Sequence, residues 1–201
     1  MLYREPDHAA LERLAYGQDG MFSSRQASAA GFSPQLLSHH VQTGRFERVR
    51  RGVYRLRGHP ESPLTRARAA ILSIGIDDAV VSHESALALL DLADVSPNEL
   101  HLTVPRGRRS VTVPDGVALH TSIDPPSGAE ILRRAGVPVT SPARSIVDAA
   151  FAGTAPEQIE MAVTDALARA LTTPRLLRDA ATRRGRRTRA LIERAIEQAQ
   201  R

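Results

Sequence analysis

One serine–histidine–glutamate triplet is the most reactive-looking combination in this sequence, at Ser82, His83 and Glu84. Side chains of adjacent residues point in different directions, whereas a working catalytic triad is assembled from distant chain segments. We therefore expect Ser82 to cap a helix that carries Glu84 in its first turn. The triplet predicts no catalytic residue.

Two further histidines, His101 and His120, lie in segments that read as strands and would offer metal ligands together with His83. Histidine ligands that are close in sequence usually have HxH or HxxxH spacing, which no pair here shows. The adjacent His39 and His40 are a weak signal. We therefore predict no metal site and no cofactor.

The missing residue types exclude whole classes of chemistry. Cysteine is absent, and all 27 residues in the Lys+Arg count are arginine. Thiolate metal sites and disulfides are thus impossible. A PD-(D/E)xK nuclease and a Walker-type phosphate loop both need a lysine. We expect a protein without enzymatic activity.

Positive charge is concentrated at the two ends of the chain. Residues 1–60 carry nine arginines against five acidic residues, 61–140 carry seven against ten, and 141–201 carry eleven against seven. These balances of +4, −3 and +4 add to the net +5. A basic surface of this kind favours a polyanionic partner such as DNA.

The first 60 residues read as three short helices. The first is expected from Pro6 to Ala15, and Ser23 with Gln26 forms a capping box for the second. For the third helix, expected from Pro34 to Thr43, Ser33 is the N-cap and Pro34 the first residue.

This third helix has two different faces. Its apolar face contains Leu36, Leu37 and Val41. The opposite stripe, at i, i+3, i+4 and i+7, consists of Gln35, Ser38, His39 and Gln42. Uncharged side chains that donate and accept hydrogen bonds suit the base edges of a major groove. The spacing predicts a recognition helix.

An arginine-rich hairpin follows at once. Residues 45–56 alternate apolar and basic side chains around an Arg51-Gly52 turn. A basic hairpin after a recognition helix is the arrangement of a winged helix-turn-helix, whose arginines hold phosphates or enter a minor groove. The expected DNA contacts are the four residues of the stripe together with Arg25, Ser33, Arg45, Arg48, Arg50, Arg51 and Arg55.

The run FSSRQASAAGFSPQLLSHHVQTGRFERVRRGVYRL resembles the N-terminal domain of AbiEi-type antitoxins. Those domains share an AAG(F/L)S turn, a recognition helix and a GR(W/F)xRVRRGVYRL wing. The segments VVSHESALALLDL, LHLTVPRGRR, ALHTS and GVPVTSPARSIVDAAF also resemble AbiEi-type proteins. The resemblance implies that the first domain represses an operon by binding operator DNA. It implies that the second neutralises a nucleotidyltransferase-type toxin.

The remaining chain reads as a mixture of helices and strands. Strands are expected at 79–84, 99–104, 111–113, 117–120 and 136–140. Helices are expected at 63–73, up to Leu90, 141–151, 156–171, 173–183 and 187–200. A basic turn contains Arg106, Arg108 and Arg109, and the run Arg183–Arg189 holds five arginines. Both could extend the DNA footprint or face an acidic partner, and the run could equally be a solvated helix boundary.

We therefore predict an α+β protein with a winged helix-turn-helix domain (1–60) and a larger mixed domain (64–201) that ends in helices. Without a signal peptide or membrane span, the cytoplasm is the expected location. The expected partners are double-stranded operator DNA, bound as a monomer or DNA-induced dimer at repeated half-sites, and the toxin. The alternative is a stand-alone regulator without a toxin partner.

Overall fold

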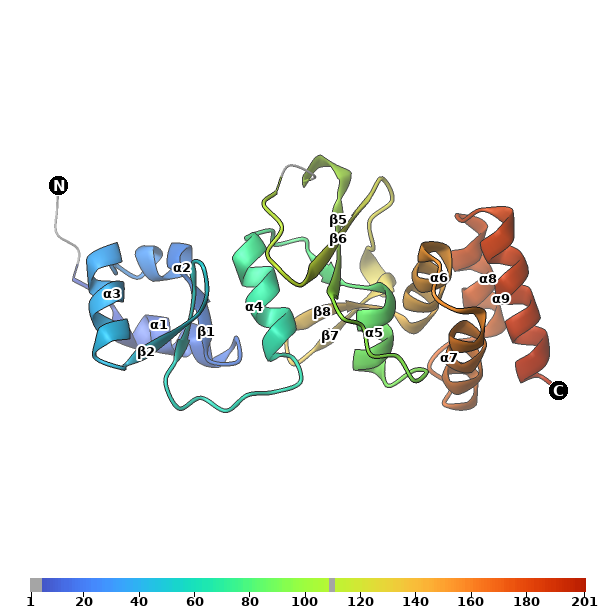
Figure 1. The fold of residues 1–201 in the computed structure, drawn as a ribbon, viewed down its shortest axis with the longest axis horizontal. Helices are drawn as coiled ribbons and strands as arrows, with labels where there is room; N and C mark the ends of the chain where they lie inside the picture. The colour runs from blue at the N-terminus through green and yellow to red at the C-terminus, as the bar shows by residue number, and fades with distance from the viewer. Residues whose placement is uncertain (1–4, 109–110) are drawn as a thin grey trace. The chain divides into compact units, whose positions relative to one another are not determined.

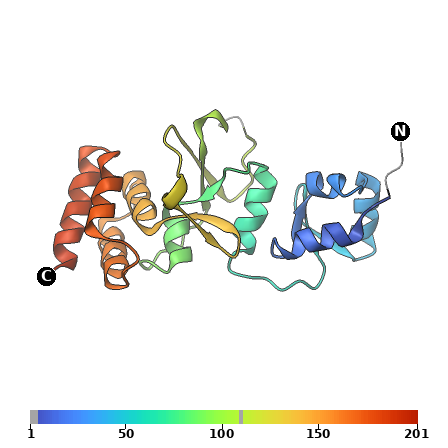
Figure 2. The same cartoon turned by 180° about the vertical axis from the view of Figure 1, so that it is seen from behind.

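The computed structural model describes residues 5–108 and 111–201 and divides into two compact units (Figures 1 and 2). The first extends to Asp77 and includes residues 135–137; the second comprises Asp78–Arg134 and Pro138–Arg201. Helices and small sheets occur in both units, which confirms the predicted α+β class. Among the described residues, no helix is both long and apolar enough to cross a bilayer.

The first unit consists of four helices and a three-stranded antiparallel sheet in the order β1-β3-β2. Its elements are α1 (His8–Tyr16), β1 (Met21–Ser23), α2 (Ser24–Ala29), α3 (Pro34–Gln42), β2 (Phe46–Arg50), β3 (Val53–Leu56) and α4 (Thr65–Ile74). The helix-turn-helix and hairpin have the predicted order, and β1 adds a third strand that the sequence analysis did not anticipate.

The local start signals in this unit act as expected. Ser23 Oγ accepts from the Gln26 amide while the Gln26 side chain accepts from the Ser23 amide, which completes the capping box. The Ser33 hydroxyl accepts from the Leu36 amide at 3.1 Å, and Pro34 is the first residue of α3. These caps fix where both helices begin.

Helix α4 extends the first unit beyond the predicted boundary at 60–64. Ala69 of α4 shares a buried cluster with Met21 of β1 and Val53 of β3. Asp19 also accepts hydrogen bonds from the hydroxyls of Ser62 (2.9 Å) and Thr65 (2.7 Å). These contacts hold the chain that follows β3 against the three-stranded sheet.

The second unit contains a five-stranded mixed sheet and five helices, in addition to short 3₁₀ turns. The sheet order is β6-β5-β4-β8-β7, with β4 (Val80–Val81), β5 (Leu100–Pro105), β6 (Val117–Ser122), β7 (Ile131–Arg134) and β8 (Val137–Thr140). Strands β5 and β6 are parallel, whereas β4 and β5 are antiparallel. The helices are α5 (His83–Leu90), α6 (Pro142–Ala152), α7 (Pro156–Ala168), α8 (Pro174–Thr182) and α9 (Arg186–Ala199).

A buried ion pair lies inside this second unit, on α6. The Nε atom of Arg144 donates to Asp148 Oδ2 at 2.8 Å, and both side chains are 3% exposed. Arg144 also donates to Glu130 and to the Asp124 carbonyl, while Arg184 donates to the second Asp148 oxygen. The two guanidinium groups therefore occupy both oxygens of Asp148.

Two expectations for the second unit are wrong. Residues 111–113 form no strand; Arg109, which was expected in the preceding turn, lies outside the described residues. Ser82 precedes α5, but its hydroxyl makes no capping bond. It instead contacts His83 Nδ1 at 2.8 Å and accepts from Thr103 Oγ1 at 2.7 Å. The hydrogen bond with Thr103 of β5 thus replaces the expected bond between the Ser82 hydroxyl and a backbone amide of α5.

The ion pair predicts a large stability difference between two arginines. Arg144→Ala leaves the buried Asp148 with Arg184 alone, and should lower the free energy of unfolding by about 3 kcal/mol. Arg175→Ala removes only an exposed pair with Asp179 and should cost at most about 0.5 kcal/mol. Urea unfolding followed by far-ultraviolet circular dichroism checks both values; equal midpoints for the two variants would contradict the assignment.

Candidate nucleic-acid interface

The predicted reading stripe of α3 is entirely on the protein surface. Its four members, Gln35, Ser38, His39 and Gln42, are all exposed. The opposite side of the helix inserts Leu37, which is 3% exposed, into the core formed around Phe22, Phe32 and Phe46. The core thus fixes the rotation of α3 and leaves the uncharged stripe available to a ligand.

The two adjacent histidines of α3 have different environments. The His40 ring lies 5.0 Å from the Phe46 ring and 5.9 Å from the Phe32 ring, measured between centroids. Burial, and to a lesser extent the charge of Arg45, lowers the pKa of His40. His40 therefore belongs to the packing of the unit, and only His39 extends from the stripe.

The wing is the hairpin of β2 and β3 (Figure 1). Its turn contains Gly52 with a φ of +73°, a conformation that glycine adopts without strain. The register shifts between Arg48 and Arg50, so one extra residue bends the strand just before the turn. Arg48 and Arg51 are exposed, while Arg50 is half-buried and has an interaction within the protein.

Arg55 does not fit the predicted role of a phosphate ligand. Its side chain is 10% exposed and is held by Glu47 at 2.6 Å and Glu61 at 3.0 Å. The buried positions of β3 are Val53 and Arg55, which face the same side because side chains alternate along a strand. The prediction assigned Arg55 to DNA together with the other arginines of the hairpin and did not distinguish the buried face of β3 from its other face.

Arg25 and Arg45 form ion pairs within the first unit, but their side chains remain accessible. Arg25 contacts Asp77 at 3.3 Å and Arg45 contacts Glu12 at 2.9 Å, with both arginine side chains at least 44% exposed. Exposed pairs contribute about 0–1 kcal/mol, so a phosphate can compete with these carboxylates. The structure leaves both residues able to reach a phosphate.

One exposed arginine next to these residues was missed. The Arg57 amide donates to the Arg45 carbonyl at 3.1 Å, so Arg57 follows the wing directly and lies beside Arg45. Arg57 is the last arginine of the basic run that begins at Arg45, and its place in this run could have predicted it as a candidate DNA contact. Ser33, by contrast, uses its hydroxyl to cap α3, although its side chain is exposed.

The basic run near the C-terminus has a partly internal role. Arg183 forms ion pairs with Asp124, at 2.7 Å, and with Glu130. Arg184 pairs with the buried Asp148. Arg184 is therefore held by a buried carboxylate of the second unit, whereas Arg183 remains 44% exposed. The run spans the boundary between α8 and α9, and its other arginines are exposed, which agrees with the expected solvated helix boundary.

Comparisons with known proteins find a family similarity within the first unit and a similar fold for the chain. Residues 10–57 match the family model described as "Transcriptional regulator, AbiEi antitoxin", which confirms the predicted resemblance over this segment. The solved structure of the RV2827C protein from Mycobacterium tuberculosis is similar in fold, with a TM-score of 0.63 and 14% sequence identity. The similarity covers 98% of this chain and 78% of that chain. The comparison with curated proteins gave no match.

The two exposed wing arginines should contribute to binding of any DNA sequence. In Arg48→Ala/Arg51→Ala, we expect weaker binding and a slope of log affinity against log salt that is smaller by about 1–2, because each phosphate contact contributes roughly 0.9. Electrophoretic mobility-shift titrations at several salt concentrations measure the slope. The matched control, Arg175→Ala/Arg194→Ala, removes the same charge from exposed positions of the second unit that lie outside both basic runs. An equal change of slope in both double variants would exclude the wing.

Proposed function

We propose, from the AbiEi antitoxin match of residues 10–57, that this protein is an antitoxin that represses its own operon by binding operator DNA. The observation that carries the proposal is an exposed uncharged stripe on α3 close in sequence to a wing with exposed arginines. Such a stripe suits base edges, and the wing suits phosphates. The role is one of binding in the cytoplasm, without catalysis.

The proposed DNA complex divides the contacts by their chemistry. The amides of Gln35 and Gln42 can each offer a donor and an acceptor to one base, which is the pattern that adenine presents in the major groove. Ser38 and His39 provide further contacts between them. Arg45, Arg48 and Arg51 would hold the backbone and add no sequence information of their own.

The second unit is the part that we propose to neutralise a nucleotidyltransferase-type toxin. Support comes from the resemblance of its segments to AbiEi-type proteins. A stand-alone regulator is the competing assignment, because the family match ends at residue 57, within the first unit. The two assignments differ in whether the chain protects cells from a toxin.

Gln35→Ala should relax sequence discrimination more than it weakens general binding. A lost bidentate base contact costs about 1–3 kcal/mol at one operator position, which is roughly a 5- to 150-fold loss of preference there. Footprinting on the promoter of the protein's own gene, followed by competition with single-base operator variants, measures this preference. Arg175→Ala is the control. An unchanged preference at every position would remove Gln35 from the reading stripe.

Repression and neutralisation should be separable by point substitutions in the full-length chain. Arg48→Ala/Arg51→Ala should derepress a reporter driven by the protein's own promoter and still rescue cells that express the proposed nucleotidyltransferase-type toxin. Failure of the wild-type chain to rescue, with repression intact, would establish the stand-alone regulator instead. Loss of both functions in the folded double variant would contradict the proposed division between the units.

A further inference from the structure

The second unit brings together the three histidines that sequence spacing had set aside. His83, His101 and His120 each offer one ring nitrogen, and these three atoms lie within 4.8 Å of one another. His120 Nε2 is 3.1 Å from His101 Nδ1, and the rings of His83 and His120 stack with centroids 3.7 Å apart. Residues from three separate elements thus converge on one point.

Strand pairing explains why two of these histidines meet. In the parallel pair of β5 and β6, Thr103 is opposite His120 and His101 is opposite Ala118. Residues two apart in a strand face the same side, so His101 and His120 are diagonal neighbours on one face of the sheet. Motifs such as HxH describe one strand or helix and cannot detect this arrangement.

His83, the third histidine, lies at the start of α5, and the residues around it are hydrogen-bonded to the backbone of β5. The His101 carbonyl accepts from the Ser82 amide at 3.0 Å, and the His101 amide donates to Ser85 Oγ at 2.9 Å. These bonds hold the start of α5 against β5. His83 itself has a φ of +53°, in the left-handed region that residues other than glycine rarely adopt. Strained backbone of this kind concentrates at functional sites.

We propose that His83, His101 and His120 bind a divalent transition-metal ion of the zinc class. Three histidine nitrogens are a common donor set for Zn²⁺, and an exogenous fourth ligand completes its tetrahedron. Nitrogens at about 2.0–2.1 Å from one ion lie roughly 3.4 Å apart, and the three nitrogens here lie within 4.8 Å of one another, so the stacked rings must turn to direct their nitrogens at one ion. The ring that donates the hydrogen bond between His101 and His120 must carry its proton on its other nitrogen when the ion binds.

The residues around the cluster provide the support that a metal-bound imidazole needs. His83 Nδ1 lies 2.8 Å from Ser82 Oγ, which also accepts from Thr103 Oγ1; when Nδ1 of His83 carries the ring proton, it donates to this oxygen. This tautomer leaves Nε2 of His83 free to coordinate.

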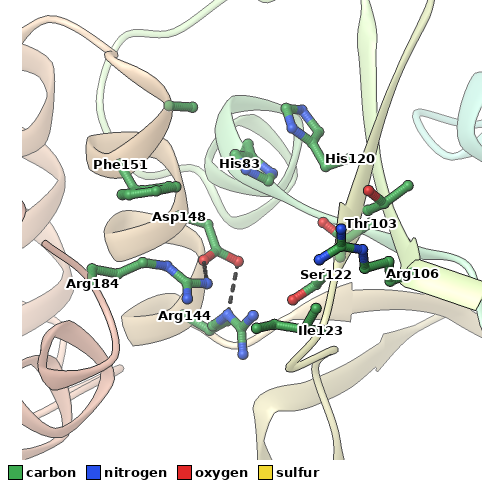
Figure 3. A pocket seen from close by; sticks show the side chains of 12 residues that line it. His83, Thr103, Arg106, His120, Ser122, Ile123, Arg144, Asp148, Phe151 and Arg184 are labelled. Atoms are coloured by element: carbon green, nitrogen blue, oxygen red, sulfur yellow. Dashed lines mark hydrogen bonds and ion pairs between the residues drawn. The ribbon is translucent and has the colours of Figure 1, made fainter. Parts of the chain in front are cut away.

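The fourth coordination position faces a pocket of about 710 Å³ that is lined by His83, His120 and a group of charged residues. Figure 3 shows Asp148 in this pocket with Arg144 and Arg184 beside it. Because both Asp148 oxygens are taken by these arginines, the carboxylate is unavailable to the ion. Arg106 also lines the pocket, so the position suits water or the oxygen of an anion.

The test uses the full-length chain without a polyhistidine tag. Isothermal titration with ZnCl₂ should give one ion per chain, and Co²⁺ should give the visible absorption of a tetrahedral nitrogen-ligated ion. His101→Gln and His120→Gln should bind at least 100-fold more weakly. His59→Gln, which removes a histidine of the first unit, should bind as the wild type does.

A variant that retains all three rings guards against loss of folding. Ser82→Ala removes only the oxygen that orients His83, and should weaken zinc binding about 10- to 100-fold with an unchanged circular dichroism spectrum. The proposal is overturned if the wild-type chain binds less than one zinc ion, or if the folded His101→Gln and His120→Gln variants bind as tightly as His59→Gln.

Discussion

A guanidinium group removed from water needs acceptors for its N–H groups, and carboxylates supply them at one buried arginine in each unit of the protein. In the first unit, Glu47 and Glu61 hold Arg55 behind the wing. In the second, Asp148 and Glu130 hold Arg144 at the start of α6. Because the chain has no lysine, every basic side chain is a planar fork able to form such bidentate contacts.

The same requirement separates structural arginines from those available to a ligand. Arg144 is buried together with its partner Asp148, and Arg55 is buried although its partners Glu47 and Glu61 are 38% and 71% exposed; both arginines are part of the fold. Arg48 and Arg51 are exposed on the wing, where a nucleic-acid phosphate can supply the negative charge. Net charge alone therefore overstates the basic surface; the charge available to a polyanionic partner is the fraction left after the internal pairs are formed.

The sequence predicted best what local chemistry determines. Ser23 with Gln26, Ser33 and the Arg51-Gly52 turn each specify a helix start or a reversal within a few residues, and all were placed correctly. The exposed stripe of α3 followed from helical periodicity in the same way.

The features that the sequence did not predict depend on contacts between residues that are distant in the chain. The Arg55 side chain is buried, and one of its carboxylate partners, Glu61, lies beyond the hairpin. The Ser82 hydroxyl does not cap α5, because it bonds to Thr103 of β5 instead. The proximity of His101 and His120 required the register between β5 and β6, which no local pattern encodes. Tertiary partners decided each of these cases.

The left-handed backbone of His83 has a consequence for how this protein tolerates change. Any residue other than glycine at such a φ costs the fold on the order of 1 kcal/mol, and asparagine tolerates it better than most. Glycine would relieve the backbone, but it would also empty the buried space that the imidazole fills and remove the partner of Ser82. Loss of a buried side chain costs more than this strain, so selection for heat resistance alone would keep a side chain at this position and leave the backbone strained.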